Sequence, residues 1–235
     1  DKHNVRIIVN RVRKKLLEVT KRTVDDVMDQ AALPLMGVVP EDVHIILAAS
    51  AQKPLLKQAK RCIYVEYFII QSGKFWDTLA DIMAQKVKEG VDVRVMYDDL
   101  GSIGTFSVTD VLELKKKGIK CIPFNPFLFI KSQLNNRDHR KIMVIDGKIA
   151  YSGGINLADE YINEKHPYGR WKDIGFRITG AGVKSFSYMF MEFWNAFSGD
   201  KICPKEIDTS DKETGNGYIL PYYDSPMGDE HISNE

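Results

Sequence analysis

Residues 135–156 read NNRDHRKIMVIDGKIAYSGGIN, and this stretch decides how the fold around it is interpreted. The residues on both sides of Asp146-Gly147 are largely apolar and β-branched. Because Asp-Gly is a preferred pair in two-residue hairpin turns, the stretch predicts two antiparallel strands that meet at Asp146. His139 and Lys141 lie near the start of the first strand, two residues apart, so their side chains point to the same face.

The polar residues of this predicted hairpin suit an anionic oxygen cluster such as phosphate. Their spacing is HxKxxxxD followed by Gly-Gly-x-Asn, and they are His139, Lys141, Asp146, Gly153, Gly154 and Asn156. The imidazole supplies a nucleophile or general base beside a fixed ammonium cation. The two glycines let backbone approach a ligand closely, and the asparagine adds amide donors. An ordinary surface pair is the alternative for His139 and Lys141. The Asp-Gly turn explains Asp146 by itself, so we assign Asp146 a structural role.

Upstream of the hairpin, strand and helix alternate from Ile63 to Pro123, which predicts an α/β fold with a largely parallel sheet flanked by helices. The first strand, residues 63–70, contains a single acid, Glu66. A charge in such a strand is normally paired or neutralised, so we expect Glu66 to support the site by meeting either a site cation or a structural arginine. The neighbouring Asp98 and Asp99 predict no metal site, because adjacent carboxylates on a loop are usually solvated or capping groups.

The composition limits the class of protein. The chain has 235 residues, 44% of them hydrophobic and 28% charged, as in a globular domain with one substantial core. A net charge of +1 does not produce the basic field of a nucleic-acid-binding domain, so no nucleic acid is expected as a partner. Cys62, Cys121 and Cys203 are far from CxxC spacing and predict neither a disulfide framework nor a zinc site. A reducing compartment fits best.

The sequence predicts three regions. Residues 1–42 are basic, with apolar positions at helical spacing, and predict a helix that either lies on an anionic bilayer or packs on its own domain. Residues 43–200 form the α/β region, in which the apolar loop 124–133 either contacts acyl chains or joins the core. Residues 201–235 predict a polar linker and the start of a second half. No apolar run approaches the roughly 18 residues of a membrane span, and we expect a piece of a longer protein whose anchor would lie outside it.

The HxKxxxxD motif of His139, Lys141 and Asp146, followed by Gly-Gly-x-Asn, resembles the signature of the phospholipase D superfamily. Three segments narrow this resemblance, namely residues 136–142, 151–156 and 169–173. Within that superfamily they look most like the first half of a bacterial cardiolipin synthase, over roughly Ala59 to Phe197. The resemblance implies a phospholipase D-like half with a mixed, mostly parallel sheet flanked by helices. It also implies that two HxKxxxxD motifs meet across a pseudo-twofold axis, and that no metal or other cofactor is required.

The resemblance assigns roles to the site residues. His139 is implied to be the nucleophile that forms a phosphohistidine, or its acid counterpart, while Lys141 and Asn156, with Gly153 and Gly154, bind the phosphate. Asp173 occupies the place of an acid that hydrogen-bonds the far nitrogen of the histidine, which would fix its tautomer. These roles are expectations from the resemblance.

The implied activity is the joining of two phosphatidylglycerol molecules into cardiolipin with release of glycerol, at the cytoplasmic face of a bacterial cell membrane. The chain holds one HxKxxxxD motif, so it would supply one of two half-sites. Its partners would be phosphatidylglycerol, the anionic membrane, and a second phospholipase D-like half from the same chain or from a homodimer. The alternatives are a single-motif homodimeric nuclease of the superfamily, and a noncatalytic half that binds anionic lipid.

Overall fold

The structure is a computed structural model that describes residues 7–12, 35–40, 55–126 and 137–204, together with Pro221 and Tyr223. The chain divides into two compact units, residues 1–51 and residues 52–235. In the first unit, β1 (Ile7–Val12) pairs in parallel with β2 (Leu35–Pro40).

The helix predicted for the basic N-terminal segment is wrong over Ile7–Val12, which forms a strand. Four of these six residues are Ile or Val, whose branched side chains favour extended backbone. Leu35–Pro40 of that segment also forms a strand, β2, and its remaining residues lie outside the described ones. So do most of the apolar loop and nearly all of the predicted linker and second-half start.

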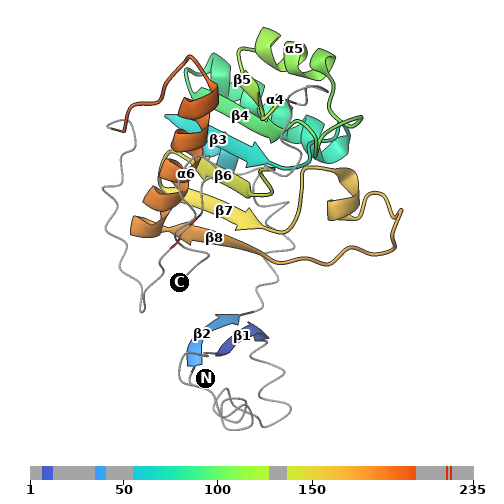
Figure 1. Cartoon of the computed structure of the whole chain (residues 1–235), viewed down its shortest axis with the longest axis vertical. Helices are drawn as coiled ribbons and strands as arrows, with labels where there is room; N and C mark the ends of the chain where they lie inside the picture. Colours follow the sequence, from blue (N-terminus) through green and yellow to red (C-terminus); the bar gives the residue numbers. More distant parts are fainter. Residues whose placement is uncertain are drawn as a thin grey trace. The chain divides into compact units, whose positions relative to one another are not determined.

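The second unit is built on a six-stranded sheet with the order β5-β4-β3-β6-β7-β8 (Figure 1). The strands are β3 (Cys62–Tyr67), β4 (Asp92–Asp98), β5 (Lys120–Phe124), β6 (Lys141–Ile145), β7 (Ile149–Gly153) and β8 (Gly175–Thr179). β3, β4 and β5 are parallel, because α4 (Lys74–Lys88) and α5 (Val108–Lys116) connect them as crossovers. β6, β7 and β8 follow as antiparallel neighbours, and the 3-10 helix η2 (Asp159–Ile162) lies between β7 and β8.

The α/β class and the mixed sheet flanked by helices are confirmed, but the expectation of a mostly parallel sheet is wrong. Three of the five strand pairings, β3 with β6, β6 with β7 and β7 with β8, are antiparallel. The alternation of strands and helices that predicted parallel pairing ends at Pro123. After it, a hairpin joins β6 to β7 and a long loop joins β7 to β8, and both connections link antiparallel neighbours.

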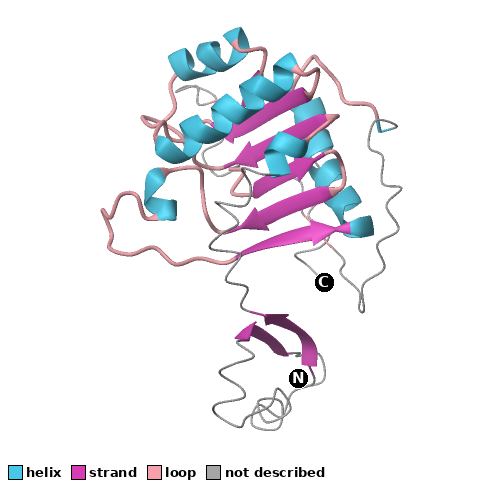
Figure 2. Cartoon of the chain, turned by 180° about the vertical axis from the view of Figure 1, so that it is seen from behind, coloured by secondary structure: helices cyan, strands magenta, loops and turns pink. Residues whose placement is uncertain are grey.

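Helices cover both faces of the sheet (Figures 1 and 2). α6 (Val183–Phe197), preceded by the 3-10 helix η3 (Gly180–Gly182), packs on β3, β6 and β7, whereas α4 packs on β4 and α5 on β5. The core beneath α6 contains alternate residues of β3 and β6, including Tyr64, Ile142 and Val144. None of the helices among the described residues is long and apolar enough to cross a membrane.

Asp146 forms the hairpin turn and also ties the hairpin to the start of β3. Asp146 and Gly147 have φ angles of 55° and 68°, the left-handed pair that a two-residue hairpin turn requires. The Asp146 carboxylate accepts hydrogen bonds from the backbone N–H groups of Lys60 (2.9 Å), Arg61 (2.7 Å) and Cys62 (3.1 Å). One side chain therefore fixes the end of the β6–β7 hairpin against the segment that enters the central strand.

Substitutions at Asp146 separate its two contributions. Asp146→Asn keeps a side-chain oxygen and tolerates left-handed backbone, whereas Asp146→Gly keeps only the backbone conformation. We expect the free energy of unfolding to fall by about 1 kcal/mol for the Asn variant and about 3 kcal/mol for the Gly variant, because three donors lose their acceptor. Urea denaturation measures both. Asp81→Asn, at an exposed acid that pairs with Lys117, is the control and should change stability little. Wild-type stability of the Gly variant would contradict this role.

Candidate active site

The pairing of β6 with β3 brings the His139–Lys141 segment to Phe68. Lys141, the first residue of β6, lies opposite Tyr67, the last residue of β3. The His139 ring is exposed and lies 4.6 Å from the Phe68 ring, between centroids, and the Lys141 ammonium nitrogen is 5.3 Å from the same ring centroid. The two side chains expected to share a face thus both lie near one aromatic ring.

The electrostatics of this pair favour a neutral imidazole. Lys141 is only 4% exposed, and its ammonium group donates a 2.6 Å hydrogen bond to the backbone carbonyl of His139. Burial lowers the pKa of Lys141 to about 8, although the charges of Asp138 and Asp173 act in the opposite direction. Partial burial and the Lys141 charge also lower the pKa of His139. A neutral imidazole is the form of histidine that can act as a nucleophile or general base.

Asn156 is buried and already bonded within the chain. Its side-chain oxygen accepts a hydrogen bond from the Ile69 N–H (3.1 Å), and its amide nitrogen donates to the Tyr161 hydroxyl (2.9 Å). The amide group carries two N–H donors, so one remains for a ligand. Asn156 therefore holds the residue next to Phe68 as well as facing the site.

The two motif glycines admit other parts of the protein rather than a ligand. A Cβ on Gly153 would lie 2.4 Å from the backbone oxygen of Ile174, and one on Gly154 would lie 2.2 Å from a carboxylate oxygen of Asp173. Gly154 also donates its N–H to Ile174 (3.0 Å). The close approach that the sequence predicted is real, but it is made to the segment that enters β8.

Asp173 does not hydrogen-bond His139 in this structure. Its carboxylate accepts from the Trp171 indole N–H (3.0 Å) and from the Ile174 backbone N–H (2.7 Å). It lies close enough to Lys141 to favour the ammonium form there. The structure therefore brings Asp173 to the Lys141 side of the site and does not place it on the imidazole.

Tyr161 and Trp171 belong to the site, although the sequence analysis did not select them. Their rings pack edge to face at 4.6 Å, so Asn156 is linked through Tyr161 and Trp171 to Asp173. Asn163, in the left-handed conformation, brackets Trp171 by accepting from its N–H (2.7 Å) and donating to its carbonyl (3.0 Å). Two aromatic residues in a polar loop were the available signal.

Glu66 meets an arginine of the motif itself. It is completely buried on the α6 side of β3, and its carboxylate lies 2.8 Å from the Arg140 guanidinium, which also contacts Asp138 at 2.9 Å. Burial, and then the charge of Asp138, raise the pKa of Glu66, while Arg140 opposes the shift. Of the two partners that the sequence left open, the structure selects the arginine.

No group of three or more His, Cys, Asp or Glu side chains in the described part of the chain is arranged to hold a metal ion.

Comparisons with known proteins indicate which family this chain resembles. Residues 53–168 match the family model described as the phospholipase D-like domain of cardiolipin synthase. An uncharacterized protein of Streptococcus mutans is 45% identical over 183 residues, which cover 77% of this chain and 40% of that protein. A cardiolipin synthase of Oceanobacillus iheyensis is 38% identical over 162 residues, which cover 68% of this chain and 34% of that protein.

Among solved structures, the phosphatidylserine synthase of Haemophilus influenzae has a similar fold, with a TM-score of 0.50 at 17% identity. The match covers 68% of this chain and 38% of that protein. The chain thus spans well under half the length of these relatives.

Glu66→Gln should change how stability depends on pH. The pKa of Glu66 is raised above its ordinary value of 4.5 in the folded protein, so above that pH the unfolded chain loses a proton that the folded protein retains. Wild-type stability therefore falls as pH rises through this window, by up to about 1.4 kcal/mol per pH unit. The Gln variant lacks this contribution, so its melting temperature should increase relative to that of the wild type as pH rises. If the melting temperatures of the two proteins changed with pH in the same way, Glu66 would not hold a proton in the folded protein. Glu113→Gln, at an exposed acid, is the control.

The two glycines should respond differently to alanine. Gly153→Ala meets a backbone oxygen, which cannot move away without shifting β8, so we expect a loss of about 1–3 kcal/mol in unfolding free energy. Gly154→Ala meets a side chain that can rotate, so we expect little loss of stability but a change in Trp171 fluorescence as Asp173 leaves the indole. Gly199→Ala has open space and is the control. Equal losses at residues 153 and 154 would rule out this distinction.

Proposed function

Because residues 53–168 belong to the phospholipase D superfamily, we propose that this chain is one half of a phosphatidyltransferase that joins two phosphatidylglycerol molecules into cardiolipin and releases glycerol. The observation that carries the proposal is the His139–Lys141 pair at Phe68, in which a neutral, exposed imidazole lies beside a buried cation. The names of relatives such as the Oceanobacillus iheyensis cardiolipin synthase support the choice of lipid.

The proposed reaction has two displacements at phosphorus. An imidazole nitrogen of His139 attacks the phosphorus of one phosphatidylglycerol, a P–N bond forms, and the P–O bond to glycerol breaks while an acid protonates the leaving oxygen. A hydroxyl of the second phosphatidylglycerol then attacks the phosphohistidine, giving its proton to the same group as the P–N bond breaks. Splitting the transfer in this way replaces one difficult step with two easier ones.

The surrounding side chains have proposed roles that follow from their placement. Lys141 binds the phosphoryl oxygens, and an anion there would raise its pKa and restore its full charge. The free N–H of Asn156 adds a donor to the same oxygens. Orientation of His139 by Asp173 requires the Asp173 carboxylate to leave Trp171, so this role depends on a change of partner when substrate binds.

The acid that serves the leaving glycerol is proposed to come from a second phospholipase D-like half, in the same protein or in a second copy. This chain holds one HxKxxxxD motif, and a single histidine cannot be nucleophile and acid in the same step. The substrate is a membrane lipid, so the active site would work at the cytoplasmic face of an anionic bacterial membrane.

The test uses full-length protein with phosphatidylglycerol vesicles. We expect His139→Gln to lower the rate of cardiolipin formation by about 10²- to 10⁴-fold, the range for loss of a positioned catalytic group. Phosphatidylglycerol radiolabelled in its phosphate should leave an acid-labile phosphatidyl group on His139 in the wild type and none in the variant. His166→Gln, at an exposed histidine in the loop before β8, is the matched control and should keep full activity.

Three outcomes would sink the proposal. The His139→Gln protein could retain wild-type transfer, the wild type could cleave DNA and not phosphatidylglycerol, or it could bind phosphatidylglycerol vesicles without any turnover. Release of phosphatidic acid in place of cardiolipin would keep His139 as nucleophile but change the acceptor from lipid to water.

A further inference from the structure

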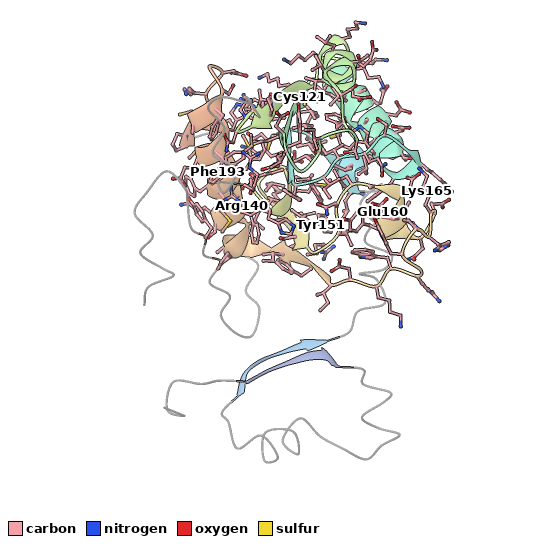
Figure 3. The ribbon with its side chains drawn as sticks, turned by 45° about the vertical axis from the view of Figure 1, so that its right-hand side comes forward. Cys121, Arg140, Tyr151, Glu160, Lys165 and Phe193 are labelled. Atoms are coloured by element: carbon pink, nitrogen blue, oxygen red, sulfur yellow. The ribbon has the colours of Figure 1, made fainter. Side chains whose placement is uncertain are left out.

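Arg140 stands between His139 and Lys141 in the sequence but on the opposite side of the sheet. Its guanidinium carbon lies 3.6 Å from the centroid of the Phe193 ring on α6, and both residues are labelled in Figure 3. The guanidinium group also contacts the carboxylates of Glu66 (2.8 Å) and Asp138 (2.9 Å). Two charges and one aromatic face therefore fix the side chain that follows the reactive histidine.

The residues on both sides of His139 are anchored, whereas its own ring makes no hydrogen bond with the described residues. The N–H of Asp138 donates to the buried Asp98 carboxylate (2.9 Å), and the Asp138 carboxylate accepts from the N–H of Arg140 (3.2 Å). The ring of His139 contacts the Phe68 ring. The position of the imidazole therefore depends on the backbone that Asp138 and Arg140 hold.

Tyr223, a residue distant in the sequence, also lies near the Arg140 guanidinium group. The Arg140 guanidinium carbon lies 5.8 Å from the ring centroid of Tyr223, whose hydroxyl donates a hydrogen bond to the Glu192 carboxylate of α6. Burial raises the pKa of Tyr223 to about 12, so its hydroxyl keeps its proton at neutral pH. Tyr223 lies beyond the linker predicted at 201–217, and it contacts the core beneath α6.

We propose that Arg140 is a positioning residue that sets the placement of His139. Tyr223 contacts both Arg140 and Glu192, so the placement of His139 also depends on how the chain returns to the domain after the predicted linker. The catalytic meaning rests on the proposed function, but the placement of the imidazole can be measured without it. An arginine suits this task because its planar fork bonds carboxylates while its faces stack on aromatic rings, which lysine cannot reproduce.

The experiment compares two arginines, the half-buried Arg140 and the buried Arg94, which both pack on α6. Arg140→Lys keeps the charge but loses the stack on Phe193. Arg94→Lys is the matched control, because Arg94 is 4% exposed, lies 5.1 Å from the Trp194 ring centroid, and pairs with Asp92 (2.7 Å). Arg94 lies opposite Tyr64 on β3, three residues from the Tyr67 that pairs with Lys141. Both variants should lower the melting temperature.

The first measurement is the rate at which diethyl pyrocarbonate acylates His139 in the full protein, followed by mass spectrometry with His166 as the internal reference. We expect Arg140→Lys to raise this rate by about fivefold, the population change that loss of one modest interaction produces, as the ring leaves Phe68. Tyr223→Ala should raise it in the same direction, and Arg94→Lys should leave it unchanged. This measurement stands even if the protein transfers no lipid.

The second measurement is transfer kinetics with phosphatidylglycerol vesicles. Arg140→Lys should lower kcat with little change in KM, because lipid binding is retained while the nucleophile is misplaced. Equal effects of the Arg140 and Arg94 variants on His139 acylation, or no effect of either, would overturn the positioning role. An unchanged rate of His139 acylation in Tyr223→Ala would overturn the proposal that the placement of His139 depends on Tyr223.

Discussion

The site depends on the extended backbone that leads into β6, which is held in place by the antiparallel pairing of β6 with β3 and which sends successive side chains to opposite faces of the sheet. The exposed His139 and the buried Lys141 lie near Phe68, while Arg140 and Ile142 lie on the side covered by α6. Reactive groups must be exposed to substrate, yet they must also be rigid. The arrangement meets both demands, since the exposed His139 lies between the buried Asp138 and the half-buried Arg140.

The side chains of Glu66, Asp138 and Arg140 carry charge away from solvent, and that charge has to be balanced within the protein. Glu66 and Asp138 share one guanidinium, that of Arg140, which leaves one carboxyl in excess. Burial raises the pKa of Glu66, so a proton held there removes the excess charge at little electrostatic expense. A network of this kind ties β3, the His139 segment and α6 together, and it is the polar counterpart of the aromatic packing beneath α6.

Close backbone contact organises the other side of the site. Gly153 and Gly154 leave room for the segment that enters β8, and this segment delivers Trp171 and Asp173 to the edge of the site. Asn156 is joined to them through Tyr161. The loop after β7 is therefore continuous with Asn156, which we propose to bind phosphate, and a change of partner by Asp173 would affect the contacts of Trp171, Tyr161 and Asn156 in turn.

The sequence alone determined the elements that obey local rules. The Asp-Gly turn at Asp146 and the shared face of His139 and Lys141 follow from turn preference and strand periodicity, which act between near neighbours. Only the tertiary structure decided which distant groups meet. These contacts are the pairing of β6 with β3, the contact of Glu66 with Arg140, and the packing of Tyr223 near Arg140, and each joins residues far apart in the chain. The structure also decided that Asp173 bonds Trp171 and not His139. No local pattern encodes such pairs, because burial and charge balance are settled when the elements pack.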